Sequence, residues 1–168
     1  MTVSEKKSAD IYSGISSSKE KFDVSYSFGK SKELKDGNDI KNILFNELIN
    51  SRESDLKKLY TSAGPHSDDL IVTLNCRDAR IYGSQGQQRS CALALKLGEA
   101  SIMGELTGEE PVVLLDDVMS ELDESRQKFI LNYLNNWQVF ITCCDPSQLM
   151  RSENGKVFEV IDGTVSER

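Results

Sequence analysis

The chain has 168 residues, of which 38% are hydrophobic and 28% are charged, and its formal net charge is −7 at pH 7. This length and composition suit one compact globular domain, or a domain with a short arm. No apolar run approaches the roughly 20 residues that span a bilayer, and no apolar segment follows the lysines near the start, so we expect neither a membrane protein nor a secreted one.

The net charge and the cysteines further restrict the kinds of protein that the chain can be. A net charge of −7 argues against a dedicated DNA-binding surface, because lysine and arginine must displace counterions from phosphates. The cysteines contain no CxxC pair, and His66 is the one histidine. We therefore expect reduced cysteines in a cytoplasmic protein, and no structural zinc site.

The first 63 residues divide into a lead and a strand–helix segment. Residues 1–20 are rich in Ser, Lys and Glu, which predicts a weakly ordered or weakly helical lead. Within residues 21–63, apolar and polar side chains alternate from Phe22 to Phe28, as in a half-buried strand. Apolar residues then recur at steps of three and four from Asp39, interpreted as an N-cap, to about Tyr60, which predicts a long amphipathic helix.

Residues 64–168 predict a C-terminal lobe that begins with a hairpin. Leu70 to Leu74 alternates again, and Arg77 to Tyr82 is expected to form the partner strand across a turn at Asn75 and Cys76. A helix should then run from Gln87 to about Met103. It is apolar on nearly every side, so we expect it to be well buried.

The second half of this lobe has the order strand, helix, strand. The continuous apolar run from Val112 to Leu115 is typical of a central parallel strand that is covered on both faces. A helix from about Asp123 to Asn135, a buried strand from Gln138 to Cys144 and a short strand over 157–161 follow. This order predicts a right-handed crossover and an α/β sheet.

Two carboxylates form the first chemical motif. Asp116 and Asp117 end the apolar strand, where α/β sheets bind ligands, and their hard oxygen atoms suit Mg²⁺. Aspartates at a strand end also begin turns or cap helices, so the pattern alone leaves both interpretations open.

Two further motifs lie at predicted helix starts. A Ser-x-Gly turn directs free backbone N–H groups and the positive end of a helix toward one point, which makes an anion site, and its residues are Ser84, Gln85, Gly86 and Gln87. An N-cap serine with nearby glycines would explain the Ser and Gly but not the glutamines. The segment from Ser120 to Asp123 has the form of a capping box, with Ser120 as N-cap and Asp123 near the third helical position.

The order and spacing of these motifs carry a family resemblance. The strings GPHSDDL (64–70), YGSQGQQRSCALALKLGEA (82–100) and PVVLLDDVMSELDESRQ (111–127) resemble the C-terminal half of the RecF family of DNA replication and repair proteins, which are ABC-type, SMC-like ATPases. The resemblance covers roughly residues 11–163. It implies an α/β fold: a partial ABC-type ATPase lobe, with a P-loop NTPase-like sheet and flanking helices, plus part of a helical arm.

The resemblance implies a role for each motif. Asp116 would help to hold Mg²⁺ through water, and Asp117 would activate or orient the attacking water during ATP hydrolysis. The turn from Ser84 to Gln87 would be the signature motif, which contacts ATP bound to the opposite subunit. Ser120 and Asp123 would form the D-loop, along the interface of an ATP-dependent homodimer.

Two family features are absent from the printed sequence. It contains no GxxGxGK[ST] string to hold the β- and γ-phosphates, and no switch histidine follows the next strand, where Thr142 and Cys143 stand. We therefore expect a fragment, a split gene product or a truncated chain that does not hydrolyse ATP by itself. Missing strands would leave sheet edges exposed, which predicts self-association.

Three classes of function stay open. The leading hypothesis is part of a RecF-like ATPase in DNA replication, recombination, repair and the SOS response, which binds ATP, single-stranded or gapped DNA and recombination mediator proteins. The acidic charge fits if the DNA surface depends on the other half and on dimerisation. The alternative is a non-catalytic interaction module that presents the signature surface to a P-loop partner. A weaker third hypothesis is a metal-dependent phosphatase or nuclease that uses Asp116 and Asp117.

Overall fold

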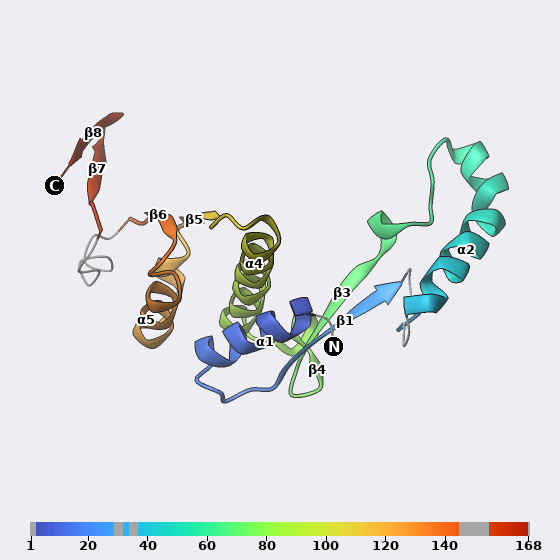
Figure 1. Cartoon of the computed structure of the whole chain (residues 1–168), viewed down its shortest axis with the longest axis horizontal. Helices are drawn as coiled ribbons and strands as arrows, with labels where there is room; N and C mark the ends of the chain where they lie inside the picture. Colours follow the sequence, from blue (N-terminus) through green and yellow to red (C-terminus); the bar gives the residue numbers. More distant parts are fainter. Residues whose placement is uncertain (1–2, 29–31, 34–36, 145–154, 168) are drawn as a thin grey trace. The chain divides into compact units, whose positions relative to one another are not determined.

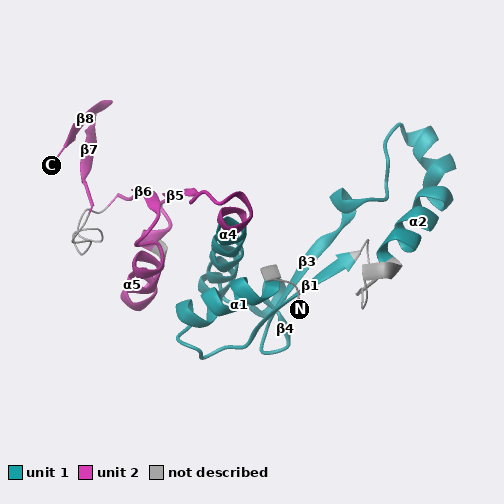
Figure 2. Ribbon diagram, in the orientation of Figure 1, with its two compact units in different colours: residues 1–102 teal, residues 103–168 magenta. Residues whose placement is uncertain are grey.

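The computed structural model describes residues 3–28, 32–33, 37–144 and 155–167 (Figure 1). The chain forms two compact units, residues 1–102 and residues 103–168 (Figure 2). The boundary falls inside helix α4 (Gln85–Thr107). The three segments that the sequence predicts, 1–20, 21–63 and 64–168, follow the family motifs and remain a prediction.

An antiparallel sheet organises the first unit. Its order is β2 (Lys32–Glu33), β1 (Phe22–Phe28), β3 (Asp69–Leu74) and β4 (Arg77–Asp78). The register pairs Phe22 with Leu74 and Tyr26 with Leu70. The predicted alternation is correct near the Phe22 end, where Phe22 and Leu74 are buried, whereas Tyr26 and Leu70 are exposed.

The lead is helical, one of the two forms that the sequence predicts, and it contributes buried side chains to the core. Helix α1 (Val3–Ile15) buries Ile11, Tyr12 and Ile15. The ring of Tyr12 stacks on that of Phe22, with 4.8 Å between the centroids. Packing of these large side chains orders a segment whose overall composition is polar.

The predicted second strand of the hairpin is wrong beyond Asp78. Asn75 and Cys76 form the expected turn, with φ of 49° and 64°. The next residues form a short helix, α3 (Ala79–Tyr82). The reason is local: the Asp78 carboxylate accepts the N–H of Arg80 at 2.7 Å, which caps a helix start.

Both long helices of this unit bury less surface than the sequence suggests. Helix α2 (Gly37–Lys58) begins two residues before Asp39, which therefore lies inside the helix and is not its N-cap. The Phe45 side chain, inside α2, is 62% exposed. In α4 the buried side chains follow one stripe that includes Leu93 and Leu97, while Ala92 is exposed, so the expectation of burial on nearly every side is wrong.

In the second unit, β5 (Val112–Asp116) and β6 (Gln138–Thr142) pair in parallel, with α5 (Glu124–Tyr133) between them along the chain. Ile130 and Leu134 are buried, as are Val113 and Leu115 of the strand. Parallel pairing is as predicted, but coverage of both faces is not. Leu114 is 74% exposed, because the burial of β5 alternates and covers one face within the described residues.

A hairpin ends the described chain. Strands β7 (Phe158–Ile161) and β8 (Thr164–Glu167) pair antiparallel around Asp162 and Gly163, which have φ of 47° and 77°. The sequence predicts the first of these strands but misses the second. In the described part of the chain, no helix is long and apolar enough to cross a membrane.

Candidate functional site

The turn at the start of α4 is closed by two reciprocal hydrogen bonds. The backbone N–H of Ser84 donates to Gln87 Oε1 at 2.7 Å, and the N–H of Gln87 donates to Ser84 Oγ at 3.3 Å. This is a capping box with glutamine in the third position. It holds the turn rigidly around Gln85 and Gly86, as an anion site at a helix start requires.

The backbone of α3 limits which residue can stand directly before this turn. A Cβ atom on Gly83 would lie 2.4 Å from the carbonyl oxygen of Ala79, so the chain tolerates only glycine there without a shift. The Gln88 side chain donates from Nε2 to the carbonyl oxygens of Arg80 and Gly83, at 3.1 Å each. Gln88 therefore ties α4 back to α3.

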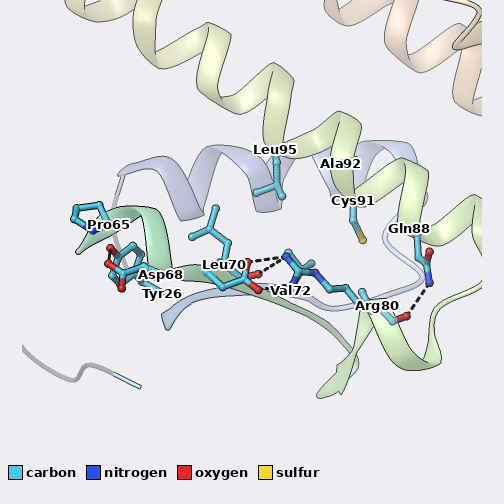
Figure 3. A pocket seen from close by; sticks show the side chains of 12 residues that line it. Tyr26, Pro65, Asp68, Leu70, Val72, Arg80, Gln88, Cys91, Ala92 and Leu95 are labelled. Atoms are coloured by element: carbon cyan, nitrogen blue, oxygen red, sulfur yellow. Dashed lines mark hydrogen bonds and ion pairs between the residues drawn. The ribbon is translucent and has the colours of Figure 1, made fainter. Parts of the chain in front are cut away.

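Asp68 and Asp69, two adjacent carboxylates at the start of β3, each accept hydrogen bonds from a side chain on another element. Both oxygen atoms of Asp69 accept hydrogen bonds from the guanidinium group of Arg80, and Asp68 accepts one from the hydroxyl of Tyr26. In Figure 3 the guanidinium group of Arg80 makes these contacts to Asp69, and the amide of Gln88 reaches the carbonyl oxygen of Arg80. The hydrogen bonds from Arg80 lower the pKa of Asp69, and the bond to Asp68 raises the pKa of Tyr26. The bonds from Arg80, which lies in α3, tie this short helix to Asp69 of β3, and the turn at Ser84 follows α3 directly.

A groove of about 510 Å³ runs beside this ion pair, with Arg80 and Asp69 on its wall (Figure 3). Leu70, Val72 and Leu95 give the groove an apolar lining. His66 is not among its lining residues. His66 lies within the short helix Pro65–Ser67, and its Nε2 atom is 2.8 Å from the carbonyl oxygen of Thr61.

The two carboxylates at the end of β5 meet the end of β6. Asp116 is in register with Thr142, and the Thr142 hydroxyl donates to Asp116 Oδ1. The N–H of Asp117 reaches both the Thr142 carbonyl oxygen, at 3.2 Å, and Thr142 Oγ1, at 3.1 Å. Thr142 therefore fixes both aspartates at once.

Asp117 takes a backbone conformation that few residues other than glycine adopt. Its φ is 51°, in the left-handed region, which aspartate tolerates better than most side chains. The Ser120 hydroxyl donates to Asp117, with 2.9 Å to Oδ1 and 2.8 Å to the carbonyl oxygen. The Asp117 carboxylate is therefore held against the loop that contains Ser120.

The capping box expected at Ser120 is wrong. Ser120 lies in a 3₁₀ turn, Met119–Glu121, and its hydroxyl is engaged with Asp117. The N-cap of α5 is Asp123, whose Oδ1 accepts the N–H of Arg126 at 3.0 Å. The reason is position along the chain. Helix α5 begins at Glu124, so its N-cap is Asp123, the residue directly before it, whereas Ser120 lies in the preceding turn.

The side-chain amide of Gln127, in α5, binds the loop between β5 and α5. Gln127 Nε2 donates to the carbonyl oxygens of Met119, at 2.6 Å, and Leu122, at 3.0 Å. Met119 itself is fully buried. Ser120 is thereby held at a fixed place beside Asp117.

The oxygen atoms of this strand end suit a hard cation that is shared with a phosphate. Asp116 supplies a carboxylate and Thr142 a hydroxyl, while no cluster of three or more His, Cys, Asp or Glu side chains exists in the described ranges. Mg²⁺ usually takes one or two protein carboxylates and completes its shell with phosphate oxygens and water. The donors present therefore fit Mg²⁺ bound together with a nucleotide better than a metal site made of protein ligands alone.

The predicted site residues fall into two groups. The turn from Ser84 to Gln87 lies in the first unit, and the strand end with Asp116, Asp117, Ser120 and Asp123 lies in the second. Asp116, Asp117 and Ser120 are joined by hydrogen bonds, directly or through Thr142, whereas the carboxylate of Asp123 caps α5. Arg80, four residues before Ser84, was missed, whereas Gln88 lies in the string that carries the family resemblance but was given no role of its own.

Comparisons with known proteins find close relatives. No family model matches. The DNA replication and repair protein RecF of Clostridium perfringens (strain 13 / Type A) is 43% identical over 162 residues, which is 95% of this chain and 44% of that protein. A structure of the recombination mediator protein RecF with ATP, in the RecFOR pathway, is 40% identical and has a TM-score of 0.71, over 99% of this chain and 43% of its own.

An SMC ATPase structure, solved in work on ATP-driven dimerization and DNA-stimulated activation, has a TM-score of 0.53 at 12% identity. It covers 99% of this chain and 82% of that one and shows a shared fold alone. The chain thus spans less than half the length of the RecF proteins that it matches. The resemblance to RecF and the ABC-type α/β fold are confirmed.

Proposed function

We propose that this chain, a relative of RecF in sequence and in fold, provides the signature turn and the acidic strand end of a DNA replication and repair ATPase. The observation that carries the proposal is the strand end itself. Asp117 stands in a left-handed turn with its carboxylate bonded to Ser120, and Thr142 bridges Asp117 to Asp116. Such a fixed pair of carboxylates suits phosphoryl transfer, which depends on positioning and on charge neutralisation.

In this proposal Asp116 helps to hold Mg²⁺, which neutralises charge on the phosphates when it is bound. Asp117 orients the attacking water and accepts its proton. In the turn from Ser84 to Gln87, the backbone N–H groups of Gln85 and Gly86 contact ATP that is bound by the opposite subunit, since those of Ser84 and Gln87 donate within the capping box. Ser120 and Asp123 lie along the interface of the resulting homodimer.

The biological setting is likewise a proposal that rests on the relatives. It places the chain in the cytoplasm, in recombinational repair and the SOS response, with single-stranded or gapped DNA and recombination mediator proteins as partners. Because the net charge of −7 argues against a DNA surface on this chain alone, the proposal assigns DNA binding to further residues and to the dimer.

The test reconstitutes the site from two polypeptides. This chain is mixed with the P-loop-bearing N-terminal part of the C. perfringens relative, and ATP hydrolysis and ATP-dependent association are measured. We expect both activities in this reconstituted mixture and neither in the chain alone. Ser84→Arg should abolish association, because the side chain fills the turn that receives the phosphate.

Asp117→Asn should keep association and lower hydrolysis by at least about 100-fold, since the amide cannot take the proton. Asp162→Asn is the matched control, because Asp162 also has a positive φ but lies in the β7–β8 turn. Association without hydrolysis in the unchanged mixture would favour the interaction module. Hydrolysis by the chain alone, or no effect of ATP on the mixture, would contradict the proposal.

A further inference from the structure

The side chain of Gln87 has both ends of its amide engaged within the first unit. Oε1 accepts the N–H of Ser84 at 2.7 Å, and Nε2 donates to Glu20 Oε1. Glu20 lies between α1 and β1, 67 residues away in the sequence. The signature turn is thus bonded to a segment outside every motif that the sequence analysis singled out.

Glu20 is itself held by a buried residue. Its second oxygen, Oε2, accepts the hydroxyl of Tyr12 at 2.5 Å. Tyr12 is 1% exposed and stacks on Phe22. A continuous path therefore leads from the core of the first unit, through one carboxylate, to the turn at Ser84.

The chemistry of this path selects one orientation of Gln87. A carboxylate only accepts hydrogen bonds, so it draws the NH₂ group of the amide and turns the amide oxygen toward the Ser84 N–H. Without that carboxylate, the amide of Gln87 could flip and place its NH₂ group against the N–H of Ser84. Both groups are donors, so this hydrogen bond of the capping box would be lost. The partly buried bond to an ionised group is also stronger than one between neutral groups.

We propose that Glu20 is a positioning residue for the signature turn, which it holds in its binding conformation through Gln87. The inference deepens the proposed function, on which it rests for the identity of the ligand, ATP. It gives α1 and the loop after it a part in the nucleotide site, although neither contains a nucleotide-binding motif.

The first test measures amide hydrogen exchange in the isolated 168-residue chain and needs no nucleotide. Glu20→Ala should speed exchange of the Ser84 amide about tenfold, since a hydrogen bond that involves a charged group is worth about 1.5 kcal/mol or more. Amides of the β1–β3 pairing should keep their protection, which shows that the fold persists. Glu99→Ala, which removes an exposed carboxylate of α4 that pairs with Lys96, is the matched control and should leave Ser84 unchanged.

A second pair of variants separates positioning from simple structural damage. Gln87→Glu alone places two carboxylates together and should open the turn as Glu20→Ala does. Adding Glu20→Gln reverses donor and acceptor: the new amide donates to residue 87 and accepts from Tyr12, while residue 87 still accepts from Ser84. Exchange at Ser84 should then return to within about twofold of the unchanged chain.

The last arm uses ATP-dependent association in the reconstituted mixture. Loss of association in Glu20→Ala and its recovery in the double variant would support the whole inference. Unchanged exchange at Ser84 in Glu20→Ala, or no recovery in the double variant, would overturn the role of Glu20. A further outcome is that exchange at Ser84 responds as expected while ATP fails to promote association in the mixture of unchanged chains. That result would support the positioning role of Glu20 and contradict the proposed function.

Discussion

The hydroxyl of Ser120 donates to the carboxylate of Asp117, with 2.9 Å between Oγ and Oδ1. The two residues lie three positions apart in a turn that Asp117 enters with a φ of 51°. This contact holds the carboxylate that the proposed function assigns to the attacking water.

Ser120→Ala should therefore lower the ATP hydrolysis rate of the reconstituted mixture about tenfold, which corresponds to about 1.4 kcal/mol of barrier. ATP-dependent association should fall much less than hydrolysis, because alanine keeps the backbone of the turn at the proposed interface and removes only the hydroxyl that holds Asp117. Steady-state phosphate release and light scattering measure the two quantities. Ser166→Ala, on the exposed strand β8, is the control. An equal fall in association would show that Ser120 acts on assembly and not on Asp117.

The ion pair between Asp69 and Arg80 should make local stability depend on pH. Hydrogen bonds from Arg80 lower the folded-state pKa of Asp69. The pair therefore stabilises α3 fully above the unfolded pKa of about 3.9, and this contribution is lost as pH falls through the lowered folded pKa. In Arg80→Ala, carbon-detected NMR titration should show the pKa of Asp69 shifted upward, whereas Lys96→Ala should leave it in place. An unshifted value in Arg80→Ala would mean that the pair does not persist in solution.

Gly98 should tolerate no larger side chain while Ser8 faces it. A Cβ atom there would lie 2.4 Å from Ser8 Oγ and 3.3 Å from Ser8 Cα, where α1 packs on α4. Gly98→Ala should lower the free energy of unfolding of the first unit by about 1–3 kcal/mol, the usual cost of overpacking. Ser8→Ala in the same chain removes the shorter contact and should restore part of that loss in a denaturant titration. Equal stability of Gly98→Ala and the unchanged chain would argue against this helix contact.

Cys91 should resist alkylation while Cys76 reacts. Cys91 is buried, and burial raises the pKa of its thiol to about 11, whereas Cys76 is exposed. At pH 8 a thiol with that pKa is only about 0.1% thiolate, the reactive form. Mass spectrometry after a short treatment with iodoacetamide should find Cys76 modified and Cys91 unmodified until denaturant is added. Labelling of both at similar rates would contradict the burial of Cys91.

The motifs were accessible from the sequence because their chemistry is local. The four residues from Ser84 to Gln87 close a turn among themselves, and Asp116 with Asp117 ends an apolar strand, so neighbouring positions and periodicity suffice to find them. The dense strings around them also predicted the kinship with RecF and the α/β fold.

The errors arose where a short-range contact overrode the pattern. Asp78 caps a helix where alternation predicted a strand, and Ser120 bonds backward to Asp117, which leaves the N-cap of α5 to Asp123. Apolar periodicity also overstated burial in α2 and β5. Apolar periodicity indicates which side chains can be buried, but it does not show which other elements of the fold cover them.

By itself, then, the sequence determined which groups could bind a phosphate and a cation, since those motifs are contiguous. Only the tertiary structure decided what holds them. Thr142 meets Asp116 and Asp117 because parallel strands end together. Glu20 is held for its bond to Gln87 by Tyr12, which stacks on Phe22 in the core. Contacts across 25 and 67 residues depend on strand register and core packing, which no local pattern encodes.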